Sequence, residues 1–252
     1  MSIEGKVALV TGGSGGLGRV HGLTLAKAGC NVALTGHGHL EKAEAVAEEI
    51  RALGRKAMGV KMDVSNLEEV QEGIKQVEAE LGPIDILVNN AAFGIVRAVT
   101  IANMNKEDWD RDLSVNLTGA FNTIKCCLPG MVERGWGRII NVSSISGTMG
   151  GLGQCSYAAT KAGLIGLTKT VALEGARGGV TCNAVVLGVF NAGSFFEVAE
   201  PFRERIIKRI AMRRAGEAQE LSNVVAFLAS EESSYLTGEA IEVSGGASLF
   251  TF

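Results

Sequence analysis

The chain has 252 residues, 46% of them hydrophobic, and its 24 basic and 27 acidic side chains give a net charge of -3. This length and composition suit one large globular domain, and the charge excludes the broad positive field that draws a protein to nucleic acid or to an anionic membrane. We therefore expect its partners to be small molecules.

Cysteine and histidine are sparse, and neither is arranged for metal binding. The five cysteines form no C-x-x-C pair and lie mostly in apolar stretches, and the histidines number three. We expect no metal site and reduced thiols, which are typical of a cytoplasmic protein. The first residues lead directly into a strand-like segment, so we expect no signal peptide, and no apolar run is long enough to span a membrane.

Strand-like and helix-like segments alternate along the chain. The predicted strands cover 6–10, 31–35, 56–61, 84–88, 138–142, 180–186 and 240–243, and the predicted helices cover 16–28, 40–53, 67–81, 109–133, 156–176 and 218–229. This alternation predicts one α/β domain over residues 1–252, a Rossmann-type doubly wound parallel sheet of about seven strands with helices on both faces. Residues 188–214 lack the alternation, and we expect them to form a variable substrate lid.

A glycine-rich turn follows the first predicted strand and opens the first predicted helix. Residues 11–18 read TGGSGGLG. Glycines permit a tight turn and let backbone N–H groups and the helix N-terminus approach a pyrophosphate. The sequence therefore predicts a dinucleotide site with contacts from Gly12, Ser14, Gly16, Leu17 and Gly18, the alternative being a flexible loop without a ligand.

The end of the second predicted strand bears on the choice of cofactor. An acidic residue at this place selects NAD, whereas a basic residue accommodates the phosphate of NADP. Here the strand ends in Thr35, Gly36 and His37, without an acidic residue. We expect NADP(H) to be favoured over NAD(H), with His37 beside the phosphate, although His37 and His39 also fit a solvated polar loop.

Tyr157, Lys161 and Ser144 are the candidate catalytic residues. Tyr157 and Lys161 are four residues apart, which places both on one face of a helix, and a nearby ammonium favours a phenolate. We expect Lys161 to move the pKa of Tyr157 down towards the working pH. Ser144 follows a predicted strand at the edge where ligands gather, and its hydroxyl is suited to binding a substrate oxygen. The neighbouring Ser143 is the alternative.

These motifs occur in an order and spacing that resemble the short-chain dehydrogenase/reductase family, in particular its branch of 3-oxoacyl-carrier-protein reductases, over essentially the whole chain. The glycine turn resembles the family's cofactor loop, Asp63-Val64 its adenine contact and Asn89-Asn90-Ala91 its sheet-stabilising strand end. Asn116, Ser144, Tyr157 and Lys161 are similar to its catalytic tetrad.

The resemblance implies an NAD(P)-dependent oxidoreductase that interconverts a secondary alcohol and a ketone by hydride transfer. It implies that Tyr157 exchanges a proton with the substrate oxygen, that Ser144 orients this oxygen and that Lys161 also holds the cofactor ribose. Asn116 is then expected to position a water that links the lysine to solvent. Further cofactor contacts are implied at Asn90, Gly188 and Val189.

The sequence departs from the family after the sixth predicted strand. Leu187-Gly188 replaces the usual Pro-Gly, and Ala192 stands where a threonine contacts the cofactor, so Asn191 or Ser194 would have to replace that contact. A largely apolar substrate pocket is expected from Phe93, Ile95, Met149, Leu152, Phe190, Phe195 and Phe196, or else these residues pack the lid or another subunit. Arg97 and Arg203 lie in this region but do not by themselves indicate recognition of a carboxylate.

Two other functions are compatible with such a fold. One is an isomerase, dehydratase or dehalogenase, although dehalogenating relatives lose the glycine turn that this chain keeps. The other is a cofactor-binding sensor without turnover, which has no chemical need for a tyrosine and a lysine on one face. The family also implies a homotetramer formed through the helices predicted at 109–133 and 156–176.

Overall fold

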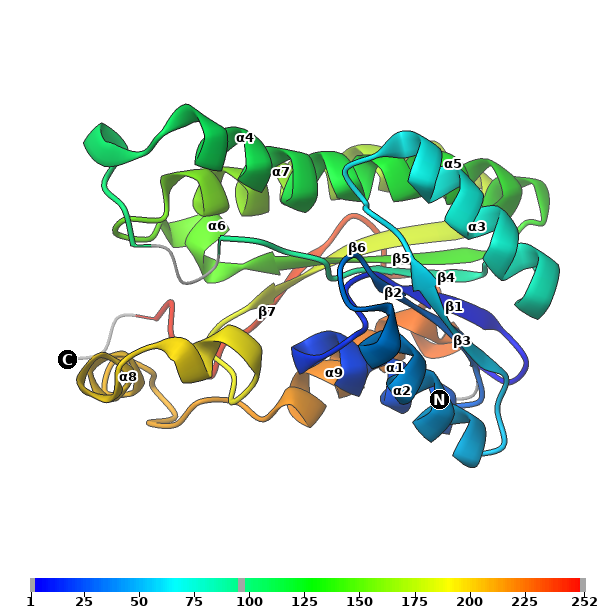
Figure 1. Cartoon of the computed structure of the whole chain (residues 1–252), viewed down its shortest axis with the longest axis horizontal. Coiled ribbons are helices and arrows are strands. Elements are labelled where there is room, and N and C mark those ends of the chain that lie inside the picture. The colour runs from blue at the N-terminus through cyan, green and yellow to red at the C-terminus, as the bar shows by residue number, and fades with distance from the viewer. Residues whose placement is uncertain (1–2, 95–97, 250–252) are drawn as a thin grey trace.

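Seven parallel strands form one sheet in the computed structural model, which describes residues 3–94 and 98–249 (Figure 1). The strands are β1 (Val7–Val10), β2 (Asn31–Gly36), β3 (Ala57–Lys61), β4 (Ile86–Asn89), β5 (Gly137–Ser144), β6 (Val180–Leu187) and β7 (Ala240–Val243). Their order in the sheet is β3-β2-β1-β4-β5-β6-β7. The doubly wound parallel sheet predicted from the alternation of segments is therefore confirmed.

Helices cover both faces of the sheet (Figure 1). On one face lie α1 (Gly16–Lys27), α2 (Leu40–Ala52) and α9 (Ala218–Ala229), and on the other lie α3 (Leu67–Leu81), α4 (Lys106–Leu113), α5 (Gly119–Glu133) and α7 (Cys155–Gly175). The structure also contains two short helices, α6 (Ile145–Met149) and α8 (Glu200–Ile207). A helical turn at 114–118 and a five-residue 3-10 helix, Gly193–Glu197, are further elements.

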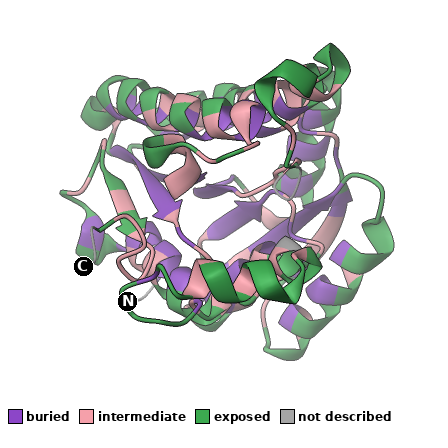
Figure 2. Cartoon of the chain, turned by 90° about the vertical axis from the view of Figure 1, so that its left-hand side faces the viewer, coloured by how far each residue is buried: buried purple, intermediate pink, exposed green. Residues whose placement is uncertain are grey.

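Two apolar cores, one on each side of the sheet, hold these layers together. β1 reads VALV and is buried throughout, as expected for a strand that helices cover on both faces. Figure 2 shows the same pattern, with buried residues along the strands and on the inner faces of the helices. On α3, the buried Val70, Ile74 and Val77 recur at helical spacing, so this helix turns one apolar stripe to the sheet.

The order of strands creates a crevice at the carboxyl edge of the sheet. β1 pairs with β2 on one side and with β4 on the other, so the connections leave β1 towards opposite edges. In open parallel sheets, ligands bind where the strand order reverses in this way. The turns that follow β1 and β4 meet here, because Asn90 donates from its backbone N and its side-chain Nδ2 to the Oγ1 and the carbonyl oxygen of Thr11, both at 3.0 Å.

Two predicted segments differ in the structure. The helix predicted at 109–133 begins earlier, at Lys106, and is interrupted by a π-helical turn, Ser114–Thr118, between α4 and α5. The segment 188–214 contains the 3-10 helix Gly193–Glu197 and α8, where the sequence showed no periodicity. None of the described helices combines the length and the apolar character that a membrane span requires.

Candidate active site

The glycine turn after β1 is built so that backbone faces the crevice. Gly12 and Gly16 have φ values of +63° and +52°, which side-chain-bearing residues rarely adopt. A Cβ at Gly18 would overlap the carbonyl oxygen of Gly12, so the first turn of α1 packs directly on the loop. The turn thus leaves backbone N–H groups and the N-terminus of α1 at the crevice, which is the arrangement that fits a pyrophosphate.

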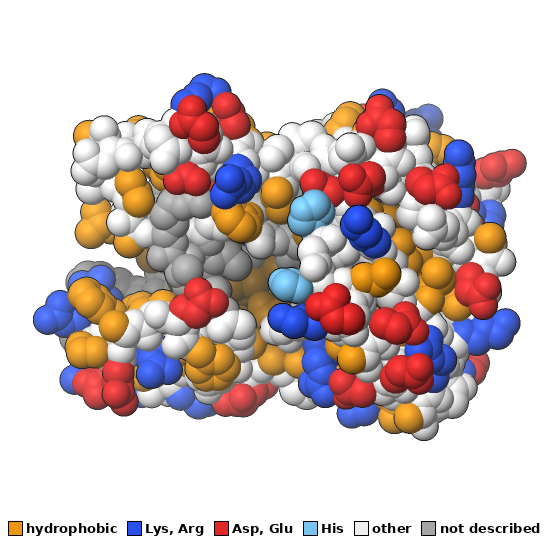
Figure 3. All heavy atoms as spheres, viewed as in Figure 1, with side chains coloured by type: hydrophobic (Ala, Val, Ile, Leu, Met, Phe, Trp, Pro, Cys, Tyr) orange, Lys and Arg blue, Asp and Glu red, His pale blue; other side chains and the backbone are white. Residues whose placement is uncertain are grey.

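The turn opens on one side into a groove of about 460 Å³, which is lined by residues that follow β1, β2, β3 and β4. Its lining includes Gly12, Ser14, Gly36, His37, Asp63, Val64, Ser65, Phe93, Arg111, Ser114 and Val115. Five of the predicted cofactor residues are thus brought to one cavity: Gly12, Ser14, His37, Asp63 and Val64. We call this cavity the adenosine groove, after the adenine contact that is expected at Asp63-Val64, and Figure 3 shows histidine side chains at the edge of the hollow in this face.

His37 and Asp63 face each other in the adenosine groove. Nδ1 of His37 lies 3.7 Å from Oδ2 of Asp63, and the side chain of His37 is 71% exposed. Oδ1 of Asp63 accepts hydrogen bonds from the backbone N and the hydroxyl of Ser65, at 2.9 and 2.7 Å. Asp63 is therefore fixed by its own turn, while His37 remains a solvent-facing side chain next to it.

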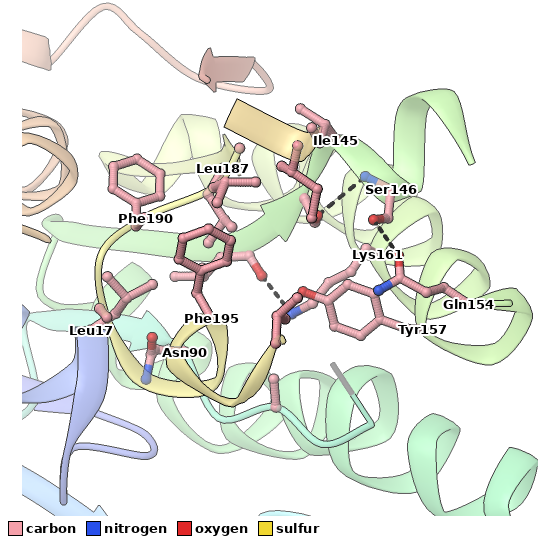
Figure 4. Close-up of a pocket in the computed structure, with 18 residues that line it drawn as sticks. Leu17, Asn90, Ile145, Ser146, Gln154, Tyr157, Lys161, Leu187, Phe190 and Phe195 are labelled. Carbon is pink, nitrogen blue, oxygen red and sulfur yellow. Dashed lines mark hydrogen bonds between the residues drawn. The ribbon is translucent and has the colours of Figure 1, made fainter. Parts of the chain in front are cut away.

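On the other side of the turn, Tyr157 and Lys161 project from α7 into a pocket of about 270 Å³ (Figure 4). Both are buried, with 4% and 2% of their surface exposed. Nζ of Lys161 donates to the carbonyl oxygen of Val142 at 2.7 Å and lies 5.5 Å from the centroid of the Tyr157 ring. The four-residue spacing has placed both groups at one site, and β5 fixes the direction of the lysine.

The pKa of Tyr157 is shifted upward in this structure, opposite to the lowering expected from Lys161. Burial raises the pKa of Tyr157 to about 12, against a smaller lowering by a hydrogen bond with Ser144. Burial also lowers the pKa of Lys161 to about 8. The ammonium of Lys161 is itself desolvated and donates to the carbonyl oxygen of Val142, and burial remains the main influence on the pKa of Tyr157. Tyr157 is accordingly a protonated group at neutral pH.

The structure distinguishes the two candidate serines. Ser144 lines the pocket, and its Oγ accepts a hydrogen bond from the backbone N of Ser146 at 3.1 Å. Ser143 is fully buried, and its hydroxyl donates to the carbonyl oxygen of Lys161 at 2.7 Å. Ser144 therefore faces the site, whereas Ser143 ties β5 to α7 behind it.

Asn116 lies in the π-helical turn and does not line the pocket. Its Oδ1 accepts from the backbone N of Phe93 at 2.7 Å, and its Nδ2 donates to the carbonyl oxygen of Phe93 at 3.0 Å and to Oγ1 of Thr160 at 3.3 Å. The side chain thus joins the segment after β4 to the residue that precedes Lys161. Such single-turn π-bulges are frequent at functional sites.

The remaining predicted cofactor contacts divide between two environments. Leu17, Asn90, Gly188 and Val189 line the same pocket as Tyr157. Gly16 and Gly18 line neither this pocket nor the adenosine groove. Gly18 is instead required by the close approach to Gly12 described above, so its place in the pattern reflects packing of the turn.

The pocket is mostly apolar, but the sequence predicted only part of its lining. Phe190 and Phe195 line it, together with Ile145, Leu187, Ala192, Val198 and Ile206. Met149, Leu152 and Phe196 are exposed and do not line it, and Phe93 lines the adenosine groove. Ile95 and Arg97 lie outside the described residues, and Arg203 is half-buried without lining the pocket. Of the aromatic residues expected from segment 188–214, Phe190 and Phe195 therefore line the pocket and Phe196 does not.

Two further polar side chains in the pocket, Ser146 and Gln154, had not been predicted. The hydroxyl of Ser146 donates to Oε1 of Gln154 at 2.9 Å. The sequence position of Gln154 could have indicated this role, since Gln154 precedes Tyr157 by three residues and stands directly before the first residue of α7. Asn191, which was expected to compensate for Ala192, donates to Glu217 at 2.7 Å instead.

Within residues 3–94 and 98–249, the structure contains no group of three or more histidine, cysteine or acidic side chains suited to a metal ion. His37 and Asp63 line the groove on one side of the glycine turn, and Ser144, Tyr157 and Lys161 line the pocket on the other. The pocket thus combines a serine hydroxyl with one buried phenol and one buried amine.

Comparisons with known proteins agree on one family. The profile of the short chain dehydrogenases matches residues 6–201. The 3-oxoacyl-(acyl-carrier-protein) reductase of Staphylococcus epidermidis is 44% identical over 241 residues, which is 96% of this chain and 98% of the relative. Nodulation protein G of Azospirillum brasilense is 43% identical over 96% of this chain and 97% of its own length. A crystal structure assigned to a gluconate dehydrogenase of Agrobacterium tumefaciens covers 99% of this chain and 98% of its own, with a TM-score of 0.94 and 30% identity.

Proposed function

The chain belongs to the short-chain dehydrogenase family and is an NAD(P)-dependent oxidoreductase, and we propose that it reduces an apolar ketone with NADPH, with Tyr157 as the proton donor. One observation carries this proposal. Tyr157, Ser144 and Lys161 meet in a mostly apolar pocket that is also lined by Leu17 of the glycine turn. A dinucleotide held by the turn would therefore have its reactive end next to a buried acid.

The residues of the pocket have separate tasks in this reaction. The nicotinamide supplies the hydride when it is bound. The hydroxyl of Ser144 donates to the substrate oxygen, because the backbone N of Ser146 already occupies the acceptor side of its Oγ. Tyr157 then gives its proton to the same oxygen, which its raised pKa allows, since the group is protonated at neutral pH.

Lys161 and Asn116 complete the proposed machinery. A protonated Lys161 stabilises the phenolate that forms when Tyr157 has given up its proton, and Lys161 is also proposed to hold the cofactor ribose. Asn116 links the segment after β4 with Thr160 and is proposed to hold the water that returns a proton to the lysine. Ser144, Tyr157 and Lys161 need no movement of the backbone to act together, because all three already line one pocket.

The adenosine groove supports a preference for NADPH. No acidic residue directly follows β2, and the basic side chain of His37 lines the groove at this place. Asp63 faces His37, but both hydrogen bonds of its Oδ1 are taken up by Ser65. A phosphate on the adenosine ribose would therefore meet no unfavourable carboxylate at the end of β2.

The lining of the pocket supports an apolar substrate. Among the described residues that line it, Lys161 is the only charged one, and Phe190, Phe195, Val198 and Ile206 of segment 188–214 cover it as the proposed lid. The relatives named 3-oxoacyl-(acyl-carrier-protein) reductases point to a 3-oxoacyl thioester as the substrate. A sugar acid fits this lining poorly, because the described lining residues offer a carboxylate no cation besides Lys161, whose Nζ donates to the carbonyl oxygen of Val142.

We also propose a cytoplasmic homotetramer. All five cysteines are unpaired, which suits a reducing compartment. Exposed apolar side chains on α5 and α7, among them Phe121 and Leu173, are suited to contacts between subunits. Light scattering that gives a monomer at micromolar concentration would contradict the tetramer.

The test of the function is the absorbance of NADPH or NADH against time, with three substrate classes: 3-oxoacyl thioesters of N-acetylcysteamine, simple apolar ketones and 5-ketogluconate. We expect consumption of NADPH with the first two classes, and none when Tyr157→Phe replaces the wild type. Turnover of 5-ketogluconate alone would refute the apolar substrate. Tight binding of NADPH without turnover of any substrate would favour a sensor instead.

A further inference from the structure

One wall of the adenosine groove is not explained by the contacts proposed above. This wall comes from the C-terminal part of α4 and the π-helical turn, which contribute Arg111, Ser114 and Val115. The guanidinium of Arg111 therefore lies on the side of the groove formed by α4, whereas the ribose is expected to bind at the end of β2. An exposed arginine can also extend into solvent, so the position of Arg111 at the groove requires a structural explanation.

Arg111 is held against an aromatic ring. The centre of its guanidinium lies 5.2 Å from the centroid of the Phe93 ring, which belongs to the segment after β4. Among the described residues, Arg111 forms no ion pair, whereas the other charged groups of the groove, His37 and Asp63, face each other at 3.7 Å. The stacked position keeps the planar group at the edge of the groove with its charge not neutralised by a carboxylate.

The helix that carries Arg111 leads directly to the predicted adenine contact. Gly119, at the start of α5, packs so closely on Val64 that a Cβ there would lie 2.6 Å from Cγ2 of Val64. Val115 and Arg111 precede Gly119 at steps of four residues, and both line the groove that Val64 also lines. Val64, Val115 and Arg111 therefore line the same groove.

We propose that Arg111 binds the adenine ring of the cofactor, with Phe93 as the support that holds the guanidinium in place. Val64 and Val115 offer apolar contacts to the faces of a purine, and a guanidinium both stacks on such a face and donates to ring nitrogens. The inference rests on the proposed position of the cofactor. It assigns Arg111 to the base, so NADPH and NADH depend on it equally.

The experiment is a fluorescence titration that gives the Kd of three reduced ligands: NADPH, NADH and nicotinamide mononucleotide, which lacks the adenosine. We expect Arg111→Ala to raise the Kd of both dinucleotides by about fivefold and to leave that of the mononucleotide unchanged. Arg111→Lys keeps the charge but loses the planar group, so it should lose most of the same affinity. Lys106→Ala is the matched control, because it removes one positive charge from α4 at a residue outside the groove.

Three results would overturn the inference. If Arg111→Ala weakened the binding of NADPH alone, Arg111 would be a ligand of the ribose phosphate. If Arg111→Lys kept full affinity, only the charge of Arg111 would matter. If Arg111→Ala kept full affinity for both dinucleotides, Arg111 would have no role in binding. Unchanged binding of the mononucleotide shows that the variant is folded. If the wild type binds neither dinucleotide, the proposed cofactor fails, and this inference with it.

Discussion

At the catalytic end of the crevice, Tyr157 and Lys161 are almost fully buried, whereas at the adenosine end the side chain of His37 is 71% exposed. The buried pair is fixed by β5 and α7, and its pKa values are shifted by burial to about 12 and about 8. The exposed groups, His37 and Arg111, are each held by a single neighbour. We therefore expect the reaction chemistry to depend on the buried pair, and the choice of cofactor to depend on the exposed His37, which can be exchanged without disturbing the core.

The largest effect should come from the buried acid. Tyr157→Phe removes the proton donor and keeps the ring that fills its place, so kcat should fall by about a thousandfold. The Kd of NADPH should stay within about twofold of wild type, because the adenosine end is untouched. Stopped-flow absorbance measures the first quantity and fluorescence titration the second. Retention of more than about a tenth of the rate would break the assignment.

The next largest effect separates the two serines. Ser144→Ala removes a donor to the substrate oxygen, and kcat/KM should fall by about a hundredfold. Ser143→Ala is its matched control, since that hydroxyl is bonded to the carbonyl of Lys161 behind the pocket. Steady-state kinetics of both variants with one ketone show which of the two serines acts on the substrate oxygen. A greater loss in Ser143→Ala would reverse their roles.

The pH dependence of reduction reports on Lys161. Because burial lowers its pKa to about 8, the ammonium is present below this pH and is lost as pH rises through it. Tyr157, with its pKa raised to about 12, stays protonated over the same range. We therefore expect kcat for reduction to be level near pH 7 and to fall by up to about tenfold per pH unit above 8. A rate that rises between pH 7 and 9 would contradict this role of the lysine.

The smallest effect is expected at the adenosine end. His37→Asp places a carboxylate after β2, where it repels the phosphate of NADPH and accepts from the ribose hydroxyls of NADH. The ratio of the two Kd values should shift by about tenfold towards NADH, with kcat little changed. His39→Asp makes the same charge change outside the groove and serves as the control. An equal shift of the Kd ratio in both variants would indicate that the added charge acts through a general electrostatic field, without a contact between residue 37 and the cofactor.

The sequence predicted the regular parts of the fold well. The bounds of α3 and α9 agree with the predicted helices, because both have an apolar stripe and a clear start. Asn66 accepts from the backbone N of Glu69 before α3, and Glu217 and Glu220 form a capping box at α9. Caps of this kind involve residues that are close together in the sequence, so they can be recognised without knowledge of the tertiary structure.

The parts that the sequence did not predict depend on three-dimensional surroundings. The π-helical turn at Asn116 arises from bonds to Phe93 and Thr160, far away in the chain, and has no periodicity of its own. The raised pKa of Tyr157 depends on how deeply it is buried, which its spacing from Lys161 does not reveal. Spacing thus identified the partners of the site, while their protonation and the lining of the lid required the packed structure.

The position of β1 between β2 and β4 also governs how the chain can fold as it is made. β1 can pair with β2 early, but its other edge stays open until β4 has been synthesised, some fifty residues after β2. Tyr157 and Lys161 reach their places later still, since α7 follows β5. A nascent chain that ends before β4 therefore carries an apolar strand with an unpaired edge, the kind of surface that aggregates. The same strand order that opens the crevice makes the first third of the protein the part that most needs protection during synthesis.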